Sequence, residues 1–234
     1  MELWLFLLRW IHFLAGITWI GLLYYFNFVQ TPFFAETDPA VRSGAIQKLV
    51  PRALWWFRWG AMATFLAGIL IYLHKLADLG GSVFYTSTYG LAITVGGLLG
   101  TIMFLNVWLV IWPNQQVVIA SATQVAKGGQ PLPDAAARGR RAALASRTNT
   151  LFSIPMLFFM GAASHYPSLI GQTSGGAAAA LIVIVLLLVG AVEANALVGT
   201  QGPTKKPLDT VSETLWAGFI LAAILDLLFL VFRG

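Results

Sequence analysis

Residues Arg9–Gln30 read RWIHFLAGITWIGLLYYFNFVQ, and this segment decides the fold class. About 20 predominantly apolar residues are enough to cross the hydrocarbon core of a bilayer as a helix. Four polar side chains interrupt the segment: Arg9, His12, Asn27 and Gln30. At about 100° per residue, these four fall within a stripe less than roughly a quarter-turn wide. The sequence therefore predicts a membrane helix with one face turned toward the protein interior.

The composition of the whole chain is typical of an integral membrane protein. Of its 234 residues, 58% are hydrophobic and only 10% are charged, and the mean hydropathy is +0.78. Soluble domains carry about 25% charged residues. The chain has no cysteine, which excludes disulfides, iron–sulfur clusters and covalently attached c-type haem. Nothing in the sequence indicates nucleic-acid binding.

Six segments are long and apolar enough to cross the membrane, so we expect an all-α bundle forming one domain over residues 1–234. A cytoplasmic helical hairpin is expected over 113–148, because a GGQPLPD turn interrupts helix-forming sequence there. The six expected spans are Leu3–Gln30, Arg58–Leu76, Tyr89–Trp112, Asn149–Leu169, Gly176–Val198 and Thr210–Phe232.

The basic residues give the bundle an orientation. Eleven of the fourteen lie in or beside three alternate loops: Arg42, Lys48, Arg52, Arg58, Lys127, Arg138, Arg140, Arg141, Arg147, Lys205 and Lys206. Loops rich in Lys and Arg stay on the cytoplasmic side. We therefore expect a multi-pass protein of the bacterial inner membrane with both termini in the periplasm.

All three histidines are expected in one layer near the outer face. Counted at 1.5 Å per residue from the inner ends of their helices, His12, His74 and His165 lie about 24–27 Å up, and Asp226 lies at about the same height. Ionisable groups at membrane depth indicate function by default. Three readings stay open at this point: a haem b site, a His/Asp site for copper or zinc, and ordinary packing or interfacial residues.

The first helix supplies the other features that a haem site would use. Gly16 lies one turn below His12 on the polar stripe and would let a flat ligand approach the backbone. Arg9 lies one turn nearer the surface, where a propionate would emerge, and Trp19 falls on the same face. His12, with His74 or His165 opposite, is the expected axial pair.

A second polar group is expected in the inner half of the membrane. Its members are Asn27, Gln30, Asn106 and Glu193. Glu193 is either a proton-relay carboxylate, a quinone ligand, or a protonated side chain that hydrogen-bonds a neighbouring helix. Asn195 lies about 200° from it around the helix and cannot share its site.

Four blocks of the sequence resemble the urate-oxidase N-terminal membrane-domain family, the membrane part of bacterial membrane-bound urate hydroxylase. They are HFLAGITWIGLLYYFNFVQTPFF (12–34), PRALWWFRWGAM (51–62), LLGTIMFLNVWLVIWPNQQ (98–116) and ASRTNTLFSIPMLFFMGAASH (145–165). Together with their loops, these blocks cover the first four expected spans, about two-thirds of the chain. The positions matched to the family pattern are His12, Trp19, Asn27, Arg52, Asn106, Arg147, Asn149 and His165. The first helix also resembles, more weakly, that of other haem-binding membrane proteins.

The resemblance implies a redox role linked to respiration. Full-length members of the family carry a C-terminal periplasmic cytochrome c domain, and no C-x-x-C-H motif occurs here. The leading hypothesis is a haem b-binding oxidoreductase domain that passes electrons from a substrate, urate by resemblance, to a separate periplasmic cytochrome c or another redox subunit. The alternatives are a non-enzymatic membrane subunit or assembly factor and a His-based metal or solute permease. Small residues over Gly96–Thr101 would allow a homodimer.

Overall fold

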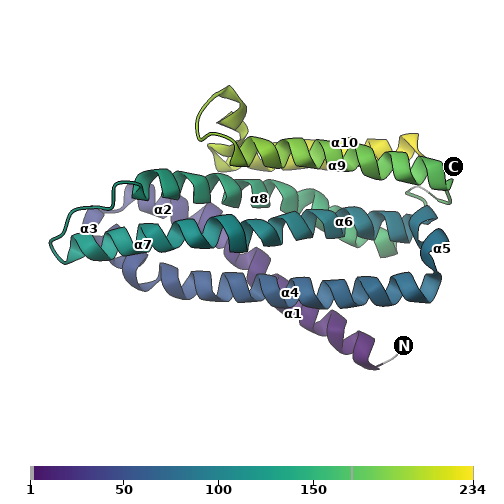
Figure 1. The fold of residues 1–234 in the computed structure, drawn as a ribbon, viewed down its shortest axis with the longest axis horizontal. Helices are drawn as coiled ribbons and strands as arrows, with labels where there is room; N and C mark the ends of the chain where they lie inside the picture. Colours follow the sequence, from purple (N-terminus) through teal and green to yellow (C-terminus); the bar gives the residue numbers. More distant parts are fainter. Residues whose placement is uncertain (1–2, 170, 234) are drawn as a thin grey trace.

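The computed structural model describes residues 3–169 and 171–233, and these form helices with no β-strand among them (Figure 1). The first half contains α1 (Leu3–Tyr24), η1 (Tyr25–Gln30), α2 (Thr31–Glu36), α3 (Pro39–Lys48), α4 (Val50–Leu79), α5 (Gly81–Thr86) and α6 (Thr88–Leu105). The second half contains η2 (Asn106–Ile111), α7 (Trp112–Ala126), α8 (Ala135–His165), α9 (Gly175–Leu197), η3 (Pro203–Leu208) and α10 (Val211–Val231).

Five helical stretches of the described residues are long and apolar enough to cross a membrane. They are Leu3–Glu36, Val50–Leu79, Thr88–Ala126, Gly175–Leu197 and Val211–Val231. Each contains most or all of one expected span, and many large apolar side chains on them are exposed, as lipid contact requires. The chain is therefore an all-α protein, and its several apolar helices are typical of a multi-pass membrane protein.

The fourth expected span lies in α8, which does not meet the same criterion of hydropathy. The reason lies in its packing: α8 contacts α1, α6, α7, α9 and α10, so much of its surface faces protein instead of lipid. Polar side chains can therefore be buried along it. They are Arg147, Thr148, Asn149, Thr150 and Ser153.

Two helices contain a π-helical segment at similar depth. The first, η1, continues α1, and the second, η2, joins α6 to α7 without a break in the helix. Each contains a buried asparagine, Asn27 in η1 and Asn106 in η2. A π-segment widens one turn of the helix and is frequent at functional sites, because it changes the direction of the side chains that follow.

The long helices run roughly along one axis, and α1 begins at the same end of the bundle at which α10 ends (Figure 1). The α7–α8 connection, α3 and η3 lie toward the opposite end, whereas α5 lies beside the first end. Glycines allow close contacts between helices. A Cβ at Gly60 of α4 would lie 3.3 Å from the backbone nitrogen of Trp19 in α1, and one at Gly218 of α10 would lie 2.8 Å from the backbone oxygen of Leu151 in α8.

Candidate functional site

His12 is held between α1 and α4 by a single hydrogen bond. Its Nδ1 lies 2.9 Å from the backbone oxygen of Thr64. A carbonyl oxygen can only accept, so Nδ1 carries the hydrogen and Nε2 keeps its lone pair. Gly68 lies against the ring, and a Cβ there would be 3.1 Å from Cε1. The imidazole is therefore oriented by the backbone of α4, with its second nitrogen available to a ligand.

The other two histidines have separate environments. His74 makes an edge-to-face contact with Trp4, with ring centroids 4.9 Å apart. His165 is exposed, and its Nδ1 donates to the oxygen of Gly161 in its own helix at 3.1 Å. We find no hydrogen bond or ring contact between any two of the three histidines in the described part of the chain.

The expected metal site of His12, His74, His165 and Asp226 is not assembled. Nowhere in residues 3–169 and 171–233 do three His, Cys, Asp or Glu side chains come together to hold a metal ion. Similar height in the membrane does not bring side chains together, because each must also face the same neighbour. Asp226 instead lies partly buried on α10, and its Oδ1 has no hydrogen-bond partner within the described part of the chain.

The remaining residues of the first helix differ in how closely they are packed. Trp19 is 2% exposed and its Nε1 has no partner among the described residues. Gly16 faces Thr64, but a Cβ there would be 3.8 Å from Thr64 Cγ2, an ordinary contact. Close approach of α1 and α4 thus depends on Gly60 and Gly68 and not on Gly16.

Two of the polar side chains expected at the inner level, Asn106 and Glu193, form a hydrogen-bonded group with Asn149 of α8. Asn106 donates through Nδ2 to the Asn149 Oδ1 at 2.9 Å and to the Glu193 Oε2 at 3.0 Å. Asn149, which is fully buried, donates to the backbone oxygen of Met103 at 2.9 Å. One hydrogen-bonded group therefore links α6–η2, α8 and α9, and we call Asn106, Asn149 and Glu193 the inner amide–carboxyl cluster.

A second set of contacts joins α1 and η1 to the same stripe of α8, because Ser146, Asn149 and Ser153 are spaced i, i+3 and i+7. The Asn27 Nδ2 donates to the Ser146 Oγ at 2.9 Å and to the backbone oxygen of Leu23 at 2.8 Å. One turn away, the hydroxyls of Tyr24 and Ser153 lie 2.9 Å apart. Among the described residues, the buried Gln30 Oε1 has no hydrogen-bond partner, so Gln30 does not bond Asn106 or Glu193 through it. Of the four residues expected to form one group, Asn106 and Glu193 hydrogen-bond each other, whereas Asn27 bonds Ser146 of α8.

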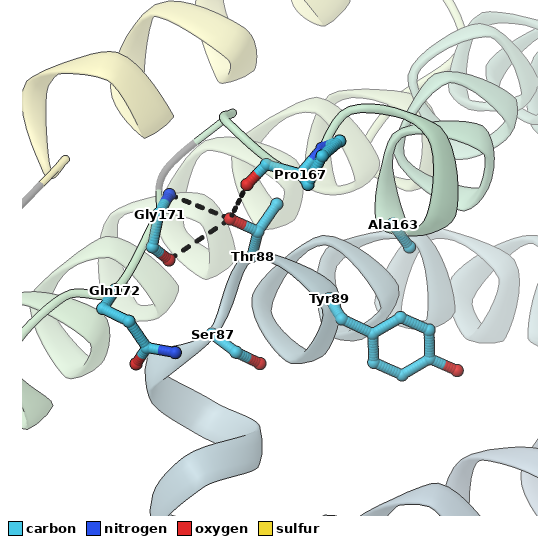
Figure 2. A pocket seen from close by; sticks show the side chains of 7 residues that line it. All are labelled: Ser87, Thr88, Tyr89, Ala163, Pro167, Gly171 and Gln172. Carbon is cyan, nitrogen blue, oxygen red and sulfur yellow. Dashed lines mark hydrogen bonds between the residues drawn. The ribbon is translucent and has the colours of Figure 1, made fainter.

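An outer pocket of about 350 Å³ lies where the start of α6 meets the segment after α8 (Figure 2). It is lined by Ser87, Thr88, Tyr89, Ala163, Pro167, Gly171 and Gln172. The Thr88 Oγ1 donates to the oxygens of Pro167 and Gly171 at 2.9 and 3.2 Å and accepts from the Gly171 nitrogen at 2.9 Å. The Tyr89 ring and the Gln172 amide extend from opposite sides of this network.

Two basic residues act on one side chain of the outer pocket. The charges of Lys75 in α4 and Arg9 in α1 both act on the Tyr89 hydroxyl, and Lys75 is itself ion-paired with Asp78 at 3.0 Å. The Thr88 hydroxyl is already hydrogen-bonded to the backbone of the loop after α8. Tyr89 and Gln172 are therefore the side chains that could contact a small molecule in the pocket. Sequence analysis did not find this pocket, because its lining comes from two turns 80 residues apart that carry no recognisable motif.

At the opposite end of the bundle, Lys205 of η3 is buried. Its Nζ donates to the backbone oxygen of Val198 at 2.9 Å and lies 3.4 Å from the Asn195 Oδ1. Burial, and then the positive charge of Arg140, lower the pKa of Lys205. Arg140 itself forms an ion pair with Asp209 at 2.7 Å, which fixes the start of α8 against the η3 segment.

Arg58 is enclosed by aromatic rings at the junction of α4, η2 and α7. Its guanidinium carbon lies 3.9 Å from the Trp112 ring centroid and 5.6 and 5.9 Å from those of Trp108 and Trp59. These contacts form a cation–π site that joins α4 to the continuous η2–α7 helix.

Comparison with known proteins gives one match: the family described as urate oxidase N-terminal matches residues 81–226. No curated protein and no solved structure matches the chain. The matched range includes the whole inner amide–carboxyl cluster and all seven residues of the outer pocket. It begins at α5, so α1 and α4, with His12 and the first two sequence blocks, lie outside it.

Proposed function

The chain belongs to the urate oxidase N-terminal family, and on that premise we propose that it is the membrane domain of a haem-linked redox protein. The observation that carries the proposal is His12. A backbone carbonyl that fixes Nδ1–H and leaves Nε2 free is the arrangement that orients a histidine for ligation of a metal. The glycine at position 68 lets the imidazole pack against the backbone of α4, since a Cβ there would lie 3.1 Å from Cε1.

His12 would hold the haem iron through its Nε2, and neither His74 nor His165 hydrogen-bonds His12 among the described residues. Haem, when bound, supplies one-electron redox chemistry. The chain would contribute the His12 Nε2 as ligand and, one turn outward, the positive charge of Arg9 for the propionates.

The outer pocket is the proposed place for a small polar substrate, urate by family membership. Arg9 brings a positive charge that would favour an organic anion, while Lys75 shares its charge with Asp78, and Tyr89 and Gln172 offer a hydroxyl and a carboxamide for hydrogen bonds. Electrons would then leave at the same end of the bundle toward a periplasmic cytochrome c.

We also propose that α8 is the sixth crossing and that both termini are periplasmic in the inner membrane. Supporting this, α1 begins and α10 ends at one end of the bundle, and the basic loops gather toward the other (Figure 1). The chain has no cysteine, so single cysteines can report sidedness. An impermeant maleimide should label Gln172→Cys in intact cells and Gln130→Cys only after lysis. The reverse pattern would refute the orientation.

The haem proposal is tested by an absorption spectrum of protein purified from cells with adequate haem supply. We expect a Soret band in the wild type, its loss in His12→Ala, and its retention in His74→Ala, the matched control on the neighbouring helix. A wild type with no Soret band and no extractable haem would refute the proposal. Retention of the band in His12→Ala would remove His12 as the ligand.

A further inference from the structure

Glu193 carries a partly buried carboxyl group in the helix bundle. The group that donates a hydrogen bond to it is a neutral amide. Glu193 lies in α9, one turn from the helix end at Leu197, and its Oε2 accepts from the Asn106 Nδ2 at 3.0 Å. Asn106 uses the same Nδ2 group for Asn149, which in turn is fixed by the backbone of Met103. The position of the carboxyl is therefore set by three neighbouring helical elements and not by an ion pair.

Two basic residues on elements that pack against α9, Arg147 and Lys205, face away from Glu193. On α8, Arg147 is two residues from Asn149, which places it about 200° around the helix, and its charge acts with those of Asp209 and Arg140. On η3, Lys205 bonds Asn195, which lies about 200° from Glu193 around α9. Among the described residues, no ion pair is formed by Glu193.

The other titratable groups on these elements lie at a distance along the bundle or at its surface. On α10, Glu213 is exposed and accepts from the Thr210 hydroxyl at 3.0 Å, and Asp226 is near the far end of that helix. On α6 and α5, the titratable residues are Tyr89 and Tyr85, both near the end where α6 begins. The cluster therefore contains one carboxyl group surrounded by neutral partners.

A carboxylate without a cation is costly to hold in such surroundings, whereas the neutral acid is not. We propose that Glu193 is a proton-binding site of this protein: it holds a proton in the resting state and exchanges it with water at the nearby end of α9. On release, the O–H bond of the carboxyl breaks, the proton passes to water, and both electrons stay on the carboxylate. Asn106 donates to Oε2 in either state, so the amide keeps the group in place while its charge changes.

This inference does not depend on haem or on a substrate. The π-segment η2 begins at Asn106, and the widened turn directs that amide toward both α8 and α9. A bundle that needed only a structural contact between these helices could use an apolar side chain at position 193. The geometry instead supplies a donor suited to a group that gains and loses a proton.

Infrared spectroscopy of the purified full-length protein tests the proposal in detergent or lipid. We expect a carbonyl-stretch band of a protonated carboxylic acid that shifts in D2O, disappears reversibly as pH is raised, and is missing in Glu193→Gln. Asp226→Asn, which removes the other partly buried carboxyl, is the matched control and should leave this band unchanged. Glu193→Asp should restore an acid band at a shifted frequency if the glutamine variant folds poorly.

Two results would overturn the proposal. If the wild type shows no acid band that depends on Glu193 at any pH at which it stays folded, the group is an ordinary carboxylate. If the band persists unchanged up to the highest pH at which the protein stays folded, Glu193 is a fixed structural acid and exchanges no proton.

Discussion

Replacement of Gly218 by alanine should separate α10 from α8. A Cβ at this position would lie 2.5 Å from Ile154 Cδ1 and 2.8 Å from the backbone oxygen of Leu151, and carbon atoms in proteins essentially never approach so closely. The Ile154 side chain can rotate away, but the carbonyl belongs to a packed helix. Overpacking of this kind costs about 1–3 kcal/mol, and alanine returns about 1 kcal/mol of helix propensity.

We therefore expect Gly218→Ala to lower the free energy of unfolding by up to about 2 kcal/mol. For a chain of this size, that corresponds to a fall in Tm of up to about 8 °C. The assay is thermal unfolding in a mild detergent, followed by circular dichroism.

Gly161→Ala on α8 is the matched control, since a Cβ there meets nothing within 4 Å. It should leave Tm unchanged or raise it slightly. If Gly218→Ala proves as stable as Gly161→Ala, the close contact of α8 with α10 is not present in the protein in solution.

Three further predictions concern other parts of the molecule. Burial and Arg140 lower the pKa of Lys205 in the folded protein, so just below the ordinary lysine pKa the unfolded chain binds more protons than the folded one. The free energy of unfolding should therefore rise with pH in that range. Lys205→Met should remove this rise, measured by urea titrations at several pH values. Tyr89→Phe and Gln172→Ala should each weaken urate binding several-fold in calorimetry without changing the fold, and equal affinity would remove the outer pocket as the substrate site. Arg58→Lys should cost about 0.5–2 kcal/mol by losing the flat contact with the Trp112 ring, measured as a fall in Tm.

The sequence predicted the helices well because hydropathy reports directly on lipid contact. The expected spans Gly176–Val198 and Thr210–Phe232 agree with α9 and α10 to within one residue or so at each end. Loop polarity does not mark where a helix stops, so Arg58–Leu76 fell short of α4, which begins at Val50. Similarly, α7 carries the third helix on to Ala126, well past the expected end at Trp112.

The candidate site was harder to predict, because a fixed angle per residue fails across a π-segment. Asn27 and Gln30 were placed on the stripe of His12 by that angle, yet η1 directs Asn27 to Ser146 of α8. Similarly, heights along separate helices could not show that His74 packs on Trp4 and that His165 bonds its own helix. Asn106 and Glu193 were grouped correctly, because both are strong polar signals in otherwise apolar segments.

The burial of α8 has a consequence for how the chain is made. Five helical stretches can partition into lipid as they leave the ribosome, but α8 carries Arg147, Asn149 and Ser153, which lipid does not solvate. Its partners are α6 and α7, made before it, and α9 and α10, made after it. A chain that ended after residue 165 would lack the contacts of α8 with α9 and α10. On the proposal that α8 crosses the membrane, we expect its insertion to depend on the helices on both sides of it in the sequence.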